Sequence, residues 1–344
     1  MSSDENDPTV GELSEGQVLR SILSQVGRVS SALVGPGDDA AVLADAGPVV
    51  ATTDTLVHGP DFRLAWSSGY DLGWKAAAVN LADIAAMGAR PTALLVALAM
   101  PNDTRLSFVE DLARGLRDAC DSLAPGCGVV GGDLTVSPTL TVAVTALGSL
   151  DGGTAVLRSG ARPGDVIAVA GELGQAAKGL AILFGRFTDD AGEPITLDPV
   201  AIKGVPDGTA QESAAQQGDA HAVEMQLRPS PPISMGPVAA ASGATAMMDV
   251  SDGLVLDATR MADASGVTID IDSRRLGPLP RLALGGGEDH ALLAAFPAGV
   301  ALPAGFTRLG TVAARGEHPV TVDGHVFGGP VGWDPYRDWD SRAG

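Results

Sequence analysis

The sequence predicts a protein of the α/β or α+β class, built in two layers and divided into two domains. Segments with the pattern of strands alternate with segments with the pattern of helices over most of the 344 residues, which is typical of two-layer architectures. At roughly 150 residues per domain, this length corresponds to about two domains. Hydrophobic residues make up 45% of the chain, but aromatic residues only 4%. The core must therefore be built mainly from Ala, Val, Leu and Ile.

The first domain is expected over residues 16–150, after a disordered acidic tail at residues 1–15. Hydrophobic periodicity and helix start and stop signals place three helices and three strands in it. The helices are expected at residues 18–26, 70–87 and 106–123, and the strands at residues 48–53, 93–99 and 140–147. The second helix is rich in Ala, with Asp71 as its candidate N-cap and with Gly88 and Pro91 after its end.

The second domain is expected over residues 151–344. Its expected elements are strands at residues 166–170 and 267–271 and helices at residues 175–183 and 255–264. Between them, residues 187–226 are rich in Asp, Gly, Pro and Gln and show no sustained hydrophobic period. Such composition is typical of an inserted, mobile loop.

The charge balance excludes several classes of function. The chain carries 22 Lys and Arg against 42 Asp and Glu, a formal net charge of −20. It therefore lacks the basic surface that nucleic acids and anionic lipids require, and neither partner is expected. The longest apolar run, residues 93–100, is too short to cross a bilayer, and the acidic N-terminus does not resemble a signal peptide. Cys120 and Cys127 form neither a disulfide framework nor a zinc pattern. A cytoplasmic protein is expected.

Six short segments place carboxylates beside glycines or among apolar residues. A carboxylate is costly to bury in such surroundings unless it is paired or binds a metal. Each segment alone also has an ordinary explanation, such as a polar turn, a strand cap or a buried salt bridge to another segment. The six groups are Asp38 with Asp39, Asp54 after Thr52 and Thr53, Asp83 on a helix face shared with Asn80, Asp133 after Gly131 and Gly132, Asp249 with Ser251 and Asp252, and Glu288 with Asp289. Together they indicate one shared role.

That role is best explained by divalent cations that carry phosphates. A chain at −20 repels phosphate groups, but Mg²⁺ is held by one or two carboxylates, while waters and substrate phosphates complete its octahedron. Opposite unit charges a few ångströms apart in a partly dry cleft attract by several kcal/mol, about 4 at an effective dielectric near 20. The sequence has no P-loop, no kinase catalytic loop and no dinucleotide fingerprint. We therefore expect a polyphosphate ligand bridged by two or more metals.

In combination, the motifs resemble a known family, the thiamine-monophosphate kinases. The resemblance runs from about residue 16 to 337, and it is the order and the combination of the strings that make it specific. The superfamily also includes aminoimidazole ribonucleotide synthetase and selenophosphate synthetase. The matching strings are Gly35-Pro36-Gly37-Asp38-Asp39, Thr52-Thr53-Asp54-Thr55-Leu56-Val57, residues 75–89, Gly131-Gly132-Asp133, Leu157-Arg158-Ser159-Gly160-Ala161, Leu227-Arg228-Pro229-Ser230-Pro231, Asp249-Val250-Ser251-Asp252-Gly253-Leu254 and Gly286-Gly287-Glu288-Asp289.

The resemblance implies a fold and an activity. The fold would be the two-domain fold of aminoimidazole ribonucleotide synthetase, with an N-terminal mixed sheet that forms a barrel in a homodimer and a C-terminal α/β domain. The nucleotide would lie between the two domains. The activity would be the ATP-dependent phosphorylation of thiamine monophosphate to thiamine diphosphate with several Mg²⁺ ions.

The resemblance also implies the site residues. Metal ligands would be Asp39, Thr52, Thr53, Asp54, Asp83, Asp133, Asp249 and Asp252. ATP would contact Gly132, Asp133, Arg158 and Ser251, and the substrate would contact Asp61, Glu288 and Tyr336. The family usually has a substrate-contacting His at the position of Asp61, whereas His58 lies three residues earlier here. Either His58 takes that role through a loop shift, or the contact is absent.

The mechanism expected from this chemistry is direct, in-line transfer. The acceptor is a phosphate oxygen that is already anionic near neutral pH, so no side chain has to act as a base. What remains is to position two anionic groups and to neutralise the transferred one, with Arg158 as a fixed positive charge. Two alternatives stay open: a related ATP-dependent synthetase on the same fold, and a non-catalytic acidic protein that binds divalent cations.

Overall fold

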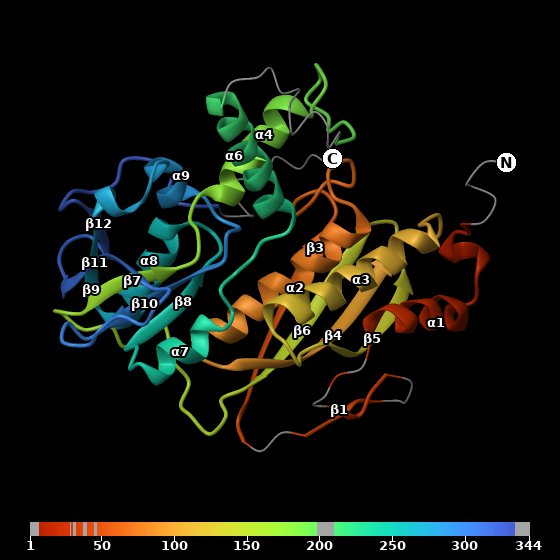
Figure 1. Ribbon diagram of the computed structural model, residues 1–344, viewed down its shortest axis with the longest axis horizontal. Helices are drawn as coiled ribbons and strands as arrows, with labels where there is room; N and C mark the ends of the chain where they lie inside the picture. The colour runs from red at the N-terminus through yellow and green to blue at the C-terminus, as the bar shows by residue number, and fades with distance from the viewer. Residues whose placement is uncertain are drawn as a thin grey trace.

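The computed structural model describes most of the chain, and two β-sheets organise it (Figure 1). Of residues 210–216 only the backbone is described. The described residues are 7–27, 29, 32–36, 40–44, 47–197 and 210–333.

The first sheet has four strands in the order β3-β6-β4-β5. β4 and β5 are parallel, and the other neighbours are antiparallel. Helices α2 and α3 lie side by side across one face (Figure 1). The elements of this half are α1 (Glu15–Val26), β1 (Ala32–Val34), β2 (Val42–Leu43), β3 (Val49–Val57), α2 (Gly69–Ala86), β4 (Arg90–Met100), α3 (Leu106–Leu123), β5 (Val129–Val136) and β6 (Thr141–Ser149).

The second sheet has six strands in the order β12-β9-β11-β7-β10-β8, antiparallel except for the pair of β12 and β9. Its hydrophobic strands β8 and β10 are buried along their whole length. The elements are β7 (Val166–Ala170), α4 (Gln175–Arg186), α6 (Ala210–Leu227), α7 (Met235–Ala241), β8 (Ala246–Val250), α8 (Leu254–Ser265), β9 (Val267–Ile271), the 3₁₀ helix η3 (Ser273–Arg275), α9 (Pro280–Gly285), β10 (Ala291–Phe296), β11 (Thr307–Ala314) and β12 (Val320–Val322).

Helix α2 belongs to the core of both halves. Its side chains share one hydrophobic cluster with Val144 of the first sheet and with Leu292 of the second. A helix that is apolar on all sides is the kind that packs between layers. The polar residues of α2, Lys75, Asn80 and Asp83, are therefore carried into the interior rather than to a solvated face, since Lys75 and Asn80 are fully buried and Asp83 is half-buried.

Glycines allow α2 and α3 to approach closely. A Cβ at Gly73 would lie 1.9 Å from the carbonyl oxygen of Leu112, and a Cβ at Gly115 would lie 2.1 Å from that of Tyr70. No side chain fits at either position without moving a backbone. These contacts fix the height of α2 over the sheet.

The expected elements are largely confirmed. The helix expected at 106–123 and the strands expected at 166–170 and 267–271 have those bounds. One detail of α2 is corrected, because its N-cap is Ser68, and Asp71 is the third helical residue, whose carboxylate accepts hydrogen bonds from the backbone and hydroxyl of Ser68. Strands β1, β2, β5, β8 and β10 to β12 were not predicted.

Two expectations of disorder are wrong where the structure describes the residues. In the expected tail, Val10–Glu12 form a 3₁₀ helix whose backbone bonds to Thr104 and Asn102. In the expected loop at 187–226, residues 210–226 belong to helix α6. Residues 198–209 lie outside the described part.

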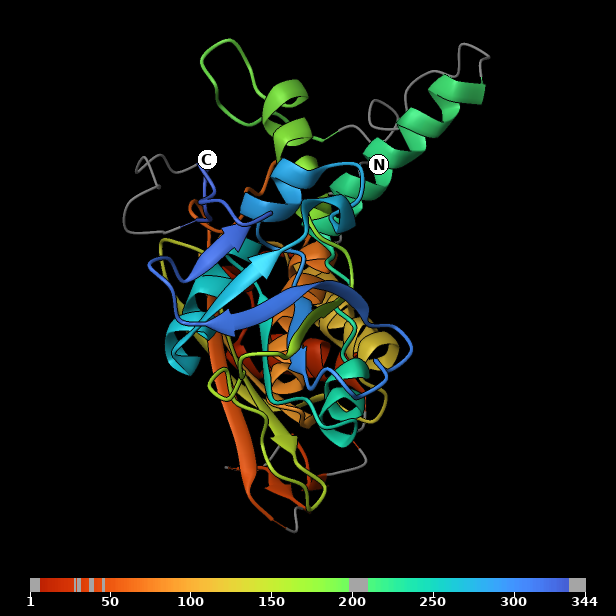
Figure 2. The ribbon, with the colours of Figure 1, turned by 90° about the vertical axis from the view of Figure 1, so that its left-hand side faces the viewer.

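The missing periodicity of α6 has a physical reason. The helix packs on α4 through small residues, since a Cβ at Gly179 would lie 2.1 Å from the carbonyl oxygen of Ala222. Among residues 217–227, whose side chains the structure describes, the buried ones, such as Val223 and Met225, lie in the last turns. The rest of α6 projects away from the body of the molecule (Figure 2). A helix that packs along only one end shows no apolar stripe.

Substitution of Gly73 tests the close crossing of α2 and α3. Gly73→Ala is expected to lower the free energy of unfolding by about 2–3 kcal/mol, because the new methyl group overlaps a backbone carbonyl. The matched control is Gly185→Ala in α4, where a Cβ would meet nothing within 4 Å. That change should raise stability by about 0.5–1 kcal/mol. Urea unfolding measures both, and equal effects of the two substitutions would contradict the packing argument.

Candidate active site

Strand β3 and helix α2 form the first half of the site. Alternation along β3 turns Thr52 and Asp54 toward the helix-covered face. The Thr52 hydroxyl donates to Asp83 Oδ2 at 2.7 Å, and the backbone N–H of Asp54 donates to Asn80 Oδ1 at 3.1 Å. Asn80 is in turn held by its own bond to the Ala76 carbonyl. The two acids of this half are thereby fixed on adjacent elements.

Strands β8 and β10 form the second half. Asp249, near the end of β8, is buried, and its Oδ2 lies 3.0 Å from Nδ1 of His290, which directly precedes β10. The turn before β10 is tight, because a Cβ at Gly287 would lie 2.2 Å from the carbonyl oxygen of Ser251. Within it, Glu288 and His290 both have left-handed backbones, with φ of 71° and 53°.

An ion pair with one buried partner joins the two halves of the site. Lys75 of α2 is 4% exposed and pairs with the partly exposed carboxylate of Glu288. Desolvation acts to raise the pKa of Glu288, but the Lys75 ammonium and the charge of His290 together outweigh it, and the pKa lies below its ordinary value. The turn before β10 is therefore tied to α2 by charge as well as by packing.

The carboxylates of the two halves repel one another. Desolvation and the charges of Asp249 and Asp54 raise the pKa of Asp83 to about 7. Desolvation also raises the pKa of Asp54; the charge of His290 opposes this shift, and the charges of Asp249 and Glu288 add to it. Carboxylates that repel one another in a partly desolvated space are short of positive charge. We refer to Asp54, Asp83 and Asp249 as the acidic cluster.

Asp252 lies next to this cluster at the start of α8. Its charge contributes to the raised pKa of Asp54, and its Oδ2 lies 2.6 Å from Arg260 Nη1. Arg260 also binds Asp257, whose carboxylate accepts the backbone N–H groups of Asp252 and Gly253. Asp257 and Arg260 thus fix the backbone that carries Asp252, and sequence reasoning did not single them out.

The chemistry of the donor set fits Mg²⁺. Carboxylate and hydroxyl oxygens are the ligands that Mg²⁺ prefers, and the cluster supplies both. Among the described residues, no three His, Cys, Asp or Glu side chains lie close enough to hold one ion by themselves. Mg²⁺ seldom needs such a cage, because waters and substrate phosphates usually complete its shell.

Asp133 and Gly132 lie elsewhere in this chain. They are exposed on β5, and three strand spacings, about 14 Å, separate β5 from β3. Asp133 pairs in register with Ala97, which pairs with Ala143. This places Asp133 on the sheet face that α2 and α3 leave uncovered. Thr53, which alternates with Thr52 and Asp54, faces the same uncovered side.

Arg158 is also separate from the acidic cluster. It is exposed, and its carbonyl accepts the hydroxyl of Ser265 at the last residue of α8. Asp252 lies just before the other end of the same helix. The first and last residues of this 12-residue helix are about 17 Å apart along its axis. Ser251 is half-buried beside Asp252.

Two of the three expected substrate contacts, Asp61 and Glu288, lie within range of each other's charge. Asp61 Oδ2 accepts the backbone N–H of Val57 at 2.7 Å. Desolvation raises the pKa of Asp61, and the charge of Glu288 adds to the shift. The ring of His58 lies 5.5 Å from that of Phe62. Asp39 and Tyr336 lie outside the described residues.

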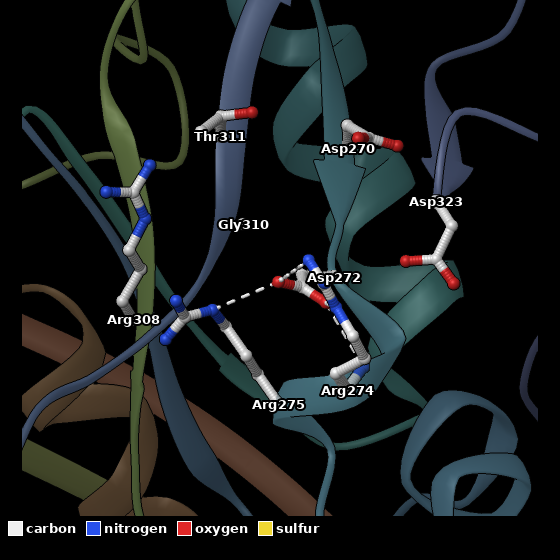
Figure 3. Close-up of a pocket in the computed structure, with 8 residues that line it drawn as sticks. All are labelled: Asp270, Asp272, Arg274, Arg275, Arg308, Gly310, Thr311 and Asp323. Carbon is white, nitrogen blue, oxygen red and sulfur yellow. Dashed lines mark hydrogen bonds and ion pairs between the residues drawn. The ribbon is translucent and has the colours of Figure 1, made fainter.

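A hollow of about 560 Å³ lies away from the acidic cluster and is lined by both acidic and basic side chains (Figure 3). Its three Arg and three Asp side chains balance in charge. Arg274 and Arg275 both bind Asp272 and hold its pKa at about 2, while Asp270 accepts from Thr321 and from the backbone of Gly324. Because its charges are largely matched internally, this hollow is a poorer phosphate–metal site than the acidic cluster. The lining residues are Asp270, Asp272, Arg274, Arg275, Arg308, Gly310, Thr311 and Asp323.

Comparison with known proteins identifies the family. Residues 37–150 match the model of the AIR synthase related protein, N-terminal domain. The thiamine-monophosphate kinase of Mycobacterium tuberculosis is 39% identical over 98% of this chain and 96% of its own length. That of Corynebacterium glutamicum is 40% identical over 95% and 94%. The chain belongs to the thiamine-monophosphate kinase family. The expectation of a kinase of this family is thereby confirmed.

Solved structures of the kinase family share the fold. The structure of thiamine-monophosphate kinase from Stenotrophomonas maltophilia K279a matches with a TM-score of 0.70 and 30% identity, over 91% of this chain and 96% of that chain. AaThiL complexed with AMPPCP and TMP matches with a TM-score of 0.67 and 31% identity, over 83% and 86%. The hydrogenase maturation protein HypE, at 20% identity and a TM-score of 0.57, shares the fold alone.

Neutralising one acid of the cluster tests its role. Asp54→Asn and Asp249→Asn are each expected to lower kcat by at least about 100-fold, because each would remove charge from the expected cation and phosphate site. Steady-state kinetics at saturating ATP measures the loss. Asp151→Asn is the control, since Asp151 forms an exposed ion pair with Arg90 that contributes little. Turnover near that of the wild type in both cluster variants would contradict the assignment.

Proposed function

We propose that this chain phosphorylates thiamine monophosphate to thiamine diphosphate, with ATP as the donor and Mg²⁺ as the cofactor. The observation that carries the proposal is the convergence of Asp54, Asp83 and Asp249 from three elements far apart in sequence. Membership of the kinase family supports it, and so does AaThiL complexed with AMPPCP and TMP, which pairs an ATP analogue with TMP in a similar fold.

The acidic cluster is the proposed Mg²⁺ site, with Thr52 and Asp252 as neighbouring ligands. When bound, Mg²⁺ neutralises and orients phosphate oxygens. The protein supplies the rigid placement of these ligands, since Thr52 and Asn80 hold Asp83 and Asp54 at fixed positions. Asp39 and Thr53 are further proposed ligands from the family resemblance.

Positive charge in the substrate explains why carboxylates also line the acceptor side. The thiazolium ring of thiamine monophosphate is a cation, and Glu288 and Asp61 are carboxylates whose charges act on each other. We assign the ring to these two residues, with Tyr336 as a further contact. Because Asp61 is already bonded to the Val57 backbone, it acts there as a fixed charge and not as a hydrogen-bond donor.

A homodimer would explain why Gly132 and Asp133 lie away from the acidic cluster within one chain. The uncovered face of the first sheet borders a hollow of about 1010 Å³ lined by Leu95, Ala97, Leu147 and Asp133, among others. Leu95 is 37% exposed there. A second copy packed on this face would bury it and bring Gly132 and Asp133 to a nucleotide at the interface. Arg158 is a further proposed ATP contact, from the family resemblance.

The reaction needs no side chain as a base. The acceptor oxygen is already anionic near neutral pH, and transfer requires alignment and charge neutralisation. No phosphoenzyme is expected. Lys75 contributes by holding Glu288 in place through their ion pair.

Product analysis tests the activity directly. Purified protein with ATP, Mg²⁺ and thiamine monophosphate should yield ADP and thiamine diphosphate in equal amounts, measured by mass spectrometry. Removal of Mg²⁺ with a chelator should stop both products. Formation of ADP with inorganic phosphate would favour a synthetase of the same superfamily. Absence of nucleotide binding at millimolar Mg²⁺ would favour a non-catalytic cation-binding protein.

A further inference from the structure

His290 is a buried polar residue to which the reaction described above gives no role. It is 5% exposed and lies between the Glu288 turn and strand β10. Its charge interacts with Asp249, Glu288 and Asp83. It therefore sits among the proposed cation ligands and the proposed substrate contact, although sequence reasoning did not single it out.

One ring nitrogen of His290 holds Asp249. Nδ1 lies 3.0 Å from Asp249 Oδ2. An ionised carboxylate only accepts hydrogen bonds, so Nδ1 carries the hydrogen and donates it. The bond fixes the plane of the Asp249 carboxylate and leaves Oδ1 as the oxygen that can meet a cation. A histidine and a carboxylate that orient each other in this way are common beside metal ligands.

The other ring nitrogen indicates that the site is made for a ligand. His290 Nε2 is buried and has no hydrogen-bond partner among the described residues. Buried polar atoms are almost always paired, and an exception calls for an explanation. A water or a phosphate oxygen carried by a bound cation would pair with this atom.

The backbone around His290 keeps the ring in place. Glu288 and His290 both have positive φ, and such strain in residues other than Gly persists only where the surroundings impose it. Between them, Asp289 accepts the N–H groups of Gly174 and Ala176 at 2.5 and 2.8 Å, at the start of α4. The turn is thus anchored from both sides, and this fixes the orientation of the imidazole.

We propose that His290 is a positioning residue of the cation site, which fixes Asp249 through Nδ1 so that Asp249 Oδ1 binds a divalent cation. The proposal rests on the proposed function of the acidic cluster. His290 acts through Asp249 and is not itself a cation ligand.

Two near-isosteric substitutions of His290 distinguish the role of Nδ1 from that of Nε2. In His290→Asn the side-chain amide occupies the place of Nδ1 and preserves the donor to Asp249. In His290→Gln the amide extends to the place of Nε2, and the bond to Asp249 is lost. His290→Ala removes both. His221→Asn is the control, because His221 forms a surface pair with Glu172 at 2.7 Å.

Isothermal titration of the full chain with Mn²⁺ measures the effect without turnover. Loss of an oriented ligand partner typically weakens metal binding 10- to 100-fold, so His290→Ala and His290→Gln should raise the Kd for Mn²⁺ by about that factor. His290→Asn and His221→Asn should stay within about 3-fold of the wild type. Thermal unfolding without metal confirms that each variant is folded.

Three outcomes would overturn the proposal: unchanged Mn²⁺ affinity in His290→Ala, equal losses in the Asn and Ala variants, or rescue by Gln but not by Asn. Product analysis of the wild type, run on the same preparation, tests the proposed function separately. A wild type that binds Mn²⁺ and forms no thiamine diphosphate would refute the activity and leave the positioning role standing.

Discussion

The repulsion among Asp54, Asp83 and Asp249 is the constraint on which the site depends. Desolvation, together with the charges of Asp249 and Asp54, raises the pKa of Asp83 to about 7. Such an arrangement is unfavourable unless positive charge enters. Lys75 and His290 supply some of it from within the chain. A bound divalent cation would supply the rest, and this links the stability of the cluster to its ligand.

The placement of α2 between the two sheets makes this arrangement possible. Because the helix packs on both sheets, its polar residues face the boundary between the two halves of the molecule. The close crossing with α3 sets the height of α2, and the Lys75–Glu288 pair ties it to the turn before β10. The same period-2 alternation that turns Asp54 toward the helix-covered face turns Thr53 toward the uncovered face, so β3 contributes side chains to both faces of the first sheet. The uncovered face is the one assigned to a second copy.

Much of this could be predicted from the sequence, but not its three-dimensional pairings. Strong periodicity located α3, Ala-rich composition with start and stop signals located α2, and carboxylates in apolar surroundings pointed to Asp54, Asp83 and Asp249. Helix α6 was missed because, over residues 217–227, only its last turns carry buried side chains. The separation of Asp133 from Asp54 depends on strand order, which no local pattern reveals. His290 and Lys75 matter through partners more than 40 residues away, although a His directly after Glu288-Asp289 was a signal that could have been followed.

Thermal unfolding with and without Mg²⁺ tests the central claim most directly. With 10 mM MgCl₂, against NaCl of equal ionic strength, the unfolding temperature of the wild type should rise by at least about 2 °C, because cation binding relieves the repulsion and stabilises the folded state. In Asp83→Asn, which has less repulsion to relieve and one ligand fewer, the rise should be much smaller. An unfolding temperature that does not respond to Mg²⁺ in either protein would contradict the account.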